Sequence, residues 1–257
     1  MTAGALILHS AVEDRGALHR RIGLVVPPAN PAAEPETAHL LEADYAIHTT
    51  RFPISHEPLR ARLEAYNRTI PDMIDSFGGL GLDALLVACS GSRYLLGPDL
   101  DRDACVALTA YYGMPVASAT FATQQVLQRL GVRELVLVSP YAEWLTELAR
   151  RFWRSAGLRV RVVAIQTASH TYAPYEVTAA DLIAQVERAH LPDDAVLLCT
   201  GTGMSTLPAL PALGAGNNRI LLTSNLCGAW WLRHVAAAPT QKPAWALQRL
   251  ITQGLRP

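Results

Sequence analysis

The sequence has little of what would identify a metalloprotein, a nucleotide-binding protein or a disulfide-rich secreted domain. Its 257 residues include four cysteines without a CxxC pair and eight histidines without the spacing of metal ligands. The motifs GxxxxGKS/T, HExxH and GxSxG are absent, and GTGMST at 201–206 lacks the third glycine of a dinucleotide-binding loop. We therefore predict reduced cysteines, no bound metal and no organic cofactor.

An excess of charge of one sign is also missing, because 22 lysine and arginine residues balance 22 aspartate and glutamate residues. Such a chain has no strong field with which to collect nucleic acid or an acidic membrane surface. The short apolar run near the N-terminus has no basic leader and is followed by acidic residues, so neither a signal peptide nor a membrane-spanning helix is predicted. We expect a cytoplasmic protein that binds a small neutral or anionic molecule.

What the sequence does contain is a regular alternation of short β-rich apolar runs and longer helical patterns. Half of the residues are hydrophobic, which is enough for one large domain or two compact halves. The alternation occurs twice, with strand-like runs IGLVV, DALLVAC and MPVAS in one series and ELVLVSPY, VRVVAI, DAVLLC and RILLTS in the other. This order predicts an α/β fold of two pseudo-symmetric halves, each a parallel sheet flanked by helices.

The boundaries follow from the same pattern. We predict an N-terminal arm over 1–20, a first half over 21–125, a second half over 126–237 that exchanges terminal elements with the first, and a helical tail over 238–257. The apolar residues of the tail and of Trp230 and Trp231 are compatible with a homo-oligomer and equally with a larger core.

Two similar stretches carry the chemistry. DALLVACSGS at 83–92 and DAVLLCTGTG at 194–203 each place a cysteine, Cys89 or Cys199, after an apolar strand. Because ligands of parallel α/β sheets bind beyond the carboxyl ends of the strands, we expect the two thiols to face one another across a single cleft. A helix starting after each thiol would ease its ionisation.

Small residues follow both cysteines, and their backbone N–H groups and hydroxyls can approach a carboxylate closely. They are Ser90, Gly91 and Ser92 in the first half and Thr200, Gly201 and Thr202 in the second. By contrast, Cys105 and Cys227 are interpreted as buried structural cysteines.

The paired cysteine stretches, together with VVPPAN at 25–30, LGVRELVLVSPY at 130–141 and SNLCGAWW at 224–231, resemble the aspartate/glutamate racemase superfamily. Within it the chain is most similar to the branch of maleate cis–trans isomerases and arylmalonate decarboxylases, from about residue 21 to residue 234.

The resemblance implies roles for individual residues. It makes Cys89 and Cys199 the two thiols, with Thr200 as the alternative to Cys199, and it implies that Asn30, Tyr141, Ser90, Gly91, Thr200 and Gly201 bind a substrate carboxylate. The stretch 167–176 lacks an asparagine that the isomerases carry there.

The implied function is cofactor-independent cis–trans isomerisation of a small dicarboxylate, with Cys89 as nucleophile and Cys199 as acid or base. Racemisation by the same two thiols, decarboxylation of an arylmalonate and non-catalytic binding of a small carboxylate are the alternatives. The decarboxylases have glycine at the position of Cys89, which argues against decarboxylation.

Overall fold

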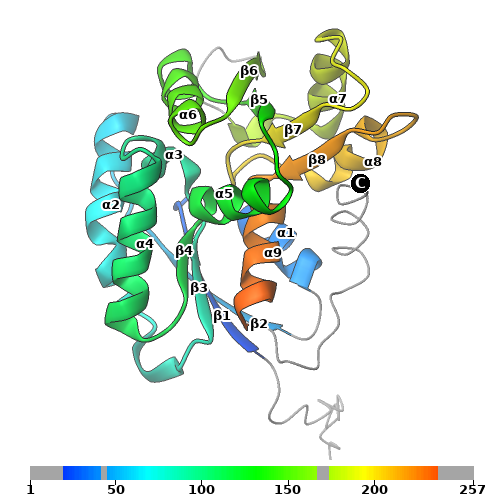
Figure 1. Cartoon of the computed structure of the whole chain (residues 1–257). Coiled ribbons are helices and arrows are strands. Elements are labelled where there is room, and N and C mark those ends of the chain that lie inside the picture. Colours follow the sequence, from blue (N-terminus) through cyan, green and yellow to red (C-terminus); the bar gives the residue numbers. More distant parts are fainter. Residues whose placement is uncertain (1–19, 42–44, 167–173, 237–257) are drawn as a thin grey trace, which may run out of the picture.

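Two four-stranded parallel sheets form the centres of two halves that lie one above the other in Figure 1. The computed structural model describes residues 20–41, 45–166 and 174–236, so residues 1–19 of the predicted arm and the predicted tail at 238–257 lie outside the described residues. The strand order is β2-β1-β3-β4 in the first sheet and β6-β5-β7-β8 in the second, which is the same topology twice. The predicted fold class is confirmed.

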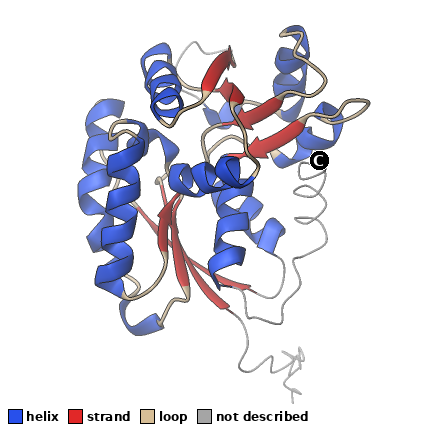
Figure 2. Cartoon of the chain, viewed as in Figure 1, coloured by secondary structure: helices blue, strands red, loops and turns tan. Residues whose placement is uncertain are grey.

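The elements of each half run in the predicted βα alternation, and Figure 2 shows how helices cover the strands. The first half comprises β1 (Arg20–Val26), α1 (Ala33–Leu41), β2 (Tyr45–Arg51), α2 (Leu59–Asp75), η2 (Gly78–Leu80), β3 (Ala84–Val87), α3 (Ser90–Tyr94), α4 (Pro98–Tyr112), β4 (Val116–Ser118) and α5 (Ala119–Arg129). The second half comprises β5 (Glu134–Ser139), α6 (Glu143–Ser155), β6 (Arg159–Ala164), η3 (Pro174–Glu176), α7 (Ala179–Arg188), β7 (Val196–Cys199), η4 (Leu207–Ala209), α8 (Leu210–Leu213), β8 (Ile220–Thr223) and α9 (Ser224–Ala236).

The sequence pattern missed two elements of the first half, α1 and β2, which it read as one polar stretch. Among the described strands β2 pairs only with β1, at the edge of the sheet, and most of its side chains are half-buried. An edge strand needs less apolar sequence than the central strands β3 and β7, which are almost entirely buried on both faces. This explains why ALLV and VLLC were recognised and YAIHTTR was not.

Buried side chains gather in three clusters. The central cluster joins the two halves and includes Val25, Val87, Cys89, Leu137, Leu145 and Leu198. The first-half cluster lies on the other face of the first sheet and includes Ile22, Leu24, Leu86, Leu226 and Trp231. The second-half cluster includes Val136, Val138, Leu197, Cys199 and Met204.

Helix α9 belongs to the second half by sequence but packs on the first half, against α1 and α5 (Figure 1). Trp231, only 3% exposed, and Leu232 therefore complete the first-half cluster. A Cβ at Gly228 would lie 2.5 Å from a methyl carbon of Leu86, so the absent side chain is what lets α9 approach β3. Within the described ranges, no helix combines the length and apolar character needed to cross a membrane.

Candidate active site

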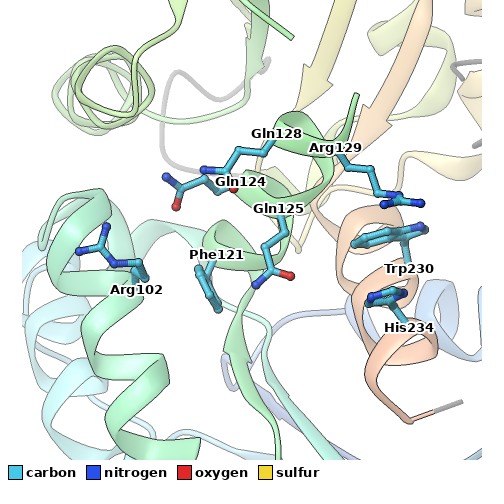
Figure 3. A pocket seen from close by; sticks show the side chains of 8 residues that line it. All are labelled: Arg102, Phe121, Gln124, Gln125, Gln128, Arg129, Trp230 and His234. Atoms are coloured by element: carbon cyan, nitrogen blue, oxygen red, sulfur yellow. The ribbon is translucent and has the colours of Figure 1, made fainter. Parts of the chain in front are cut away.

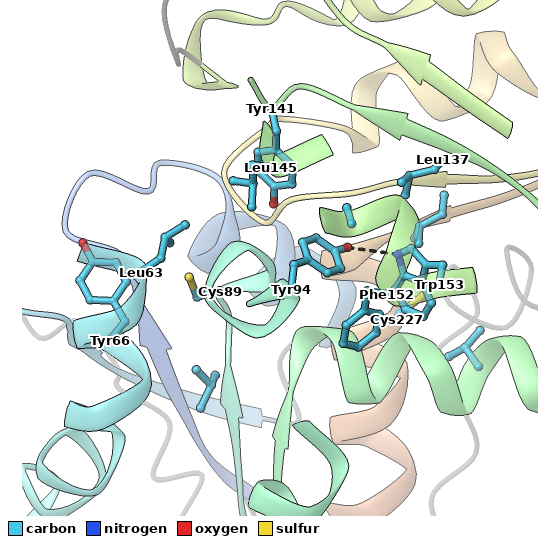
Figure 4. Packing of buried hydrophobic residues seen from close by; sticks show 14 of the residues in the cluster. Leu63, Tyr66, Cys89, Tyr94, Leu137, Tyr141, Leu145, Phe152, Trp153 and Cys227 are labelled. Carbon is cyan, nitrogen blue, oxygen red and sulfur yellow. Dashed lines mark hydrogen bonds between the residues drawn. The ribbon is translucent and has the colours of Figure 1, made fainter. Parts of the chain in front are cut away.

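The carboxyl ends of β3 and β7 meet at the boundary between the halves, and Cys89 lies there. It directly precedes α3 and is 4% exposed. Figure 4 shows Leu63 and Tyr66 of α2 on one side of the thiol, and Tyr141 and Leu145 of the second half on the other. A Cβ on Gly91 would contact both Leu63 and Leu145 at 3.5–3.6 Å, so the segment after Cys89 lies between the two halves.

The electrostatic setting of Cys89 differs from the one predicted. Burial raises the pKa of the thiol, and this effect outweighs the opposing hydrogen bonds from Ser92 and from the N–H of Gly91 and the positive charge of Arg93. The prediction of eased ionisation was therefore wrong, because the desolvation of a buried thiolate outweighs the stabilisation that the short helix α3 gives it.

Two tyrosines that the sequence reading did not single out share the surroundings of Cys89. Burial, and after it the proximity of Cys89, raises the pKa of Tyr66 and raises that of Tyr175 to about 12. Tyr175 also lies close to the loop that follows β7, since a Cβ on Gly203 in that loop would lie 2.3 Å from the Tyr175 ring.

Cys199 lies in a different environment. Its side chain is 1% exposed and belongs to the second-half cluster, whereas the preceding residue, Leu198, belongs to the central cluster with Cys89. Burial, and then the negative charge of Glu36, raises the pKa of the Cys199 thiol to about 12. The two sulfur atoms are thus in separate clusters, and their pairing across one cavity is not confirmed. The helix expected after Cys199 is wrong as well, because a loop follows β7.

Thr200 is the residue of the second half that points toward the central cluster. Side chains alternate along a strand, so the residue after Cys199 turns to the face that Leu198 occupies. The Thr200 side chain is completely buried, and its Oγ1 lies 2.5 Å from the hydroxyl of Tyr94, a member of the central cluster. Counting along the sequence gives the same result: Cys89 is six residues after Asp83, and the sixth residue after Asp194 is Thr200.

Asn30 joins the halves at this site. Its Oδ1 accepts hydrogen bonds from the N–H groups of Ala32 and Ala33, and its Nδ2 donates to Oγ1 of Thr202 at 3.0 Å. The Thr202 hydroxyl donates in turn to the carbonyl of Ala88, the residue before Cys89. Asn30 therefore fixes the loop after β7 to the end of β3 and has one further N–H on Nδ2.

The remaining predicted site residues lie in the same region. The hydroxyl of Ser90 donates to Oγ of Ser224 at 3.2 Å, and the N–H of Gly201 donates to the same Oγ at 3.1 Å. Gly201 has a φ of +94°, and a Cβ there would lie 2.9 Å from the hydroxyl of Tyr141. Gly201 is required both by its backbone conformation and by the close approach of Tyr141.

Glu36 of α1 is a buried carboxylate, 6% exposed, next to the loop that follows β7. The sequence did not indicate its role. Its oxygens accept hydrogen bonds from the N–H and hydroxyl of Thr206, the N–H of Leu207 and Nδ2 of Asn225, at 2.6–3.3 Å. Asn225 also donates to the carbonyl of Thr202. A lone glutamate in a stretch that was not predicted as a helix gives no sequence signal of this role, because its partners are about 170 to 190 residues away.

A surface cavity lies away from Cys89. A cavity of about 520 Å³ between α4, α5 and α9 (Figure 3) is lined by Arg102, Phe121, Gln124, Gln125, Gln128, Arg129, Trp230 and His234. None of the predicted site residues lines this cavity. Among the described residues, no group of three or more His, Cys, Asp or Glu side chains is placed to hold a metal ion.

The fold and site define a class: α/β proteins of two like halves, in which the ends of parallel strands from both halves meet at a buried thiol. Residues 22–250 match the arylmalonate decarboxylase family, and the chain belongs to this family. The predicted resemblance is thereby confirmed.

Named relatives show the same relationship. The chain is 26% identical over 243 residues to a maleate isomerase of Geobacillus stearothermophilus, covering 82% of this chain and 94% of that protein. The structure of maleate isomerase Iso from Pseudomonas putida S16 superposes with a TM-score of 0.77 at 20% identity, covering 87% and 95% of the two chains. A Nocardia farcinica maleate cis-trans isomerase mutant with a covalently bound succinylcysteine intermediate superposes with a TM-score of 0.74 at 22% identity, covering 86% and 94%.

Proposed function

We propose that this protein is a cofactor-independent isomerase that converts a small cis-dicarboxylate, such as maleate, into its trans isomer, with Cys89 as the nucleophile. The observation that carries the proposal is the position of Cys89, buried between the two halves at the end of β3, in a chain whose named relatives are maleate isomerases. The covalent succinylcysteine of the Nocardia farcinica enzyme shows that this fold supports attack by sulfur.

The reaction needs only one covalent bond to form and break. Cys89 first loses its proton, a step that burial makes harder. The resulting thiolate adds to one olefinic carbon, and the π electrons move to the neighbouring carbon and its carboxylate, which becomes an enediolate. The former double bond is now single and rotates. The electrons then return, the carbon–sulfur bond breaks, and the trans product leaves with the thiolate regenerated.

Hydrogen-bond donors on the opposite side must stabilise the enediolate, and we assign this role to Thr200 together with Tyr141. Thr200 points to the central cluster, and Tyr141 lies against the adjacent Gly201. Each well-placed donor contributes on the order of 3 kcal/mol to such a transition state. Cys199, the residue first expected here, lies in the second-half cluster, so Thr200 replaces it in the proposed mechanism.

Racemisation by two thiols is less well supported. It requires sulfur on both sides of one carbon atom, and the second sulfur lies on the other side of β7. Non-catalytic binding of a carboxylate is also less well supported, because binding alone does not require a thiol at this position.

Proton NMR of the protein incubated with maleate in D₂O tests the proposal. Fumarate should appear with the wild type and with Cys105→Ala, a control outside the site, and should fall by about 10³-fold or more in Cys89→Ser. Thr200→Val should lose about 10²-fold, whereas Cys199→Ala should lose little. No turnover of any cis-dicarboxylate, or full activity in Cys89→Ser, would contradict the proposed function.

A further inference from the structure

Three buried side chains, those of Trp153, Tyr94 and Thr200, are connected in this order by hydrogen bonds. Nε1 of Trp153 in α6 donates to the hydroxyl of Tyr94 in α3 at 3.3 Å, drawn as a dashed line in Figure 4. The same hydroxyl lies 2.5 Å from Oγ1 of Thr200. All three side chains are at most 3% exposed, so water does not compete for these contacts.

The chemistry of these side chains determines which group donates each hydrogen bond. An indole N–H only donates, so the oxygen of Tyr94 is an acceptor toward Trp153. A phenol is a stronger acid than an alkyl alcohol, and burial raises the pKa of Tyr94 further, so its proton is present at any ordinary pH. Among the described residues, Thr200 is the one acceptor within reach of that proton. Tyr94 therefore donates to Thr200.

This direction leaves the proton of the Thr200 hydroxyl without an acceptor within the described part of the chain. A buried hydroxyl with an unused proton is costly unless a ligand takes the bond. Thr200 begins the loop whose next residue, Gly201, touches Tyr141, and the rings of Tyr94 and Tyr141 lie 6.3 Å apart, edge to face. The unused proton thus lies at the central cluster, which contains Tyr94, Tyr141 and Cys89.

We propose that Tyr94, held by Trp153, is a positioning residue that fixes the Thr200 hydroxyl as a hydrogen-bond donor to the substrate carboxylate opposite Cys89. This inference rests on the proposed function and adds to it the reason why a threonine serves at this place. A hydroxyl alone rotates freely, but one that already accepts from Tyr94 has its own proton directed away from Tyr94. The aligned bonds also polarise one another, which strengthens the donor.

A double-mutant cycle on turnover of maleate tests the inference. Tyr94→Phe removes the hydroxyl and keeps the ring, and we expect kcat to fall roughly tenfold while KM changes less than about twofold. Tyr94→Phe should have no further effect in a Thr200→Val protein, because Tyr94 acts through Thr200. Thr200→Ser should retain the dependence on Tyr94. The matched control is Tyr112→Phe, which removes a hydroxyl that bonds Asp75 and the carbonyl of Pro71.

The outcomes separate the two claims. An active wild type in which Tyr94→Phe loses nothing, or loses the same factor with and without the Thr200 hydroxyl, would overturn the inference and leave the proposed function standing. If the wild type has no turnover of maleate or of any other cis-dicarboxylate, the proposed function and the inference that rests on it are both overturned.

Discussion

Nδ2 of Asn30 lies 3.0 Å from Oγ1 of Thr202, and this hydrogen bond joins residues of the two halves at the candidate site. Because the Thr202 hydroxyl also donates to the carbonyl of Ala88, the loop that carries Thr200 is fixed to the residue before Cys89. The thiol and the proposed donor are therefore held in one rigid network although they belong to different sheets.

The buried carboxylate of Glu36 should be a main support of this network. In Glu36→Gln, the amide N–H₂ replaces an oxygen that accepts from N–H groups, so at least one donor is left facing another donor. We expect the free energy of unfolding to fall by about 3 kcal/mol. Urea denaturation measures this effect. Glu64→Gln, which removes an exposed ion pair with Arg60, should change it by less than about 1 kcal/mol. Equal effects in the two variants would contradict the supporting role of Glu36.

Gly201 should be intolerant of a side chain for two separable reasons. Gly201→Ala places a Cβ at a φ of +94° and 2.9 Å from the Tyr141 hydroxyl. Gly131 shares a positive φ, +65°, but a Cβ there would meet nothing within 4 Å, so Gly131→Ala reports the backbone strain alone, about 1 kcal/mol.

We expect Gly201→Ala to cost about 2 kcal/mol more than this control and to lower turnover as well. Adding Tyr141→Phe should restore part of the stability, because the atom at 2.9 Å is the hydroxyl oxygen. Thermal unfolding of these three variants and the wild type provides the comparison, and a Gly201→Ala protein no less stable than Gly131→Ala would refute the close contact.

The pH dependence of stability should identify Cys199 as a core residue. Burial raises its pKa to about 12, against an ordinary value of 9.0 that the unfolded chain retains. Below pH 9 both states are protonated and the thiol contributes equally to each. Between pH 9 and pH 12 only the unfolded state loses the proton, so the folded state loses about 1.4 kcal/mol per pH unit from this group.

Wild-type protein should therefore lose stability more steeply than Cys199→Ala as the pH rises from 9 to 11, by about that slope. Urea denaturation at intervals of half a pH unit measures the difference. If the two proteins show parallel curves, Cys199 titrates normally in the folded state, and an active-site position for it regains support.

The sequence predicted the fold because central parallel strands are uniform apolar runs, and ALLV and VLLC are unmistakable in this respect. It predicted the region of the site from the same two strands. In the second half the sequence left Cys199 and Thr200 as alternatives. Because a difference of one residue reverses the face of a strand, the two side chains contact different clusters, and the letters alone do not show which one faces Cys89.

Other parts of the site had no local signal. Tyr94 and Trp153 read as ordinary core aromatics, and their hydrogen bonds connect segments 59 and 106 residues apart. Likewise burial is the largest cause of the raised pKa of Cys89, and it outweighs the lowering by Gly91, Ser92 and Arg93, which follow the thiol in the sequence. That burial comes from packing between the halves, which no local pattern reveals.

The packing of α9 on the first half has a consequence for synthesis of the protein. Trp231 and Leu232, near the end of the described chain, cover the apolar face formed by β1, β3 and α1. A nascent chain that has emerged only as far as α5 therefore exposes that face, and its first half reaches its final packing only after α9 has been translated. The two halves must therefore mature together.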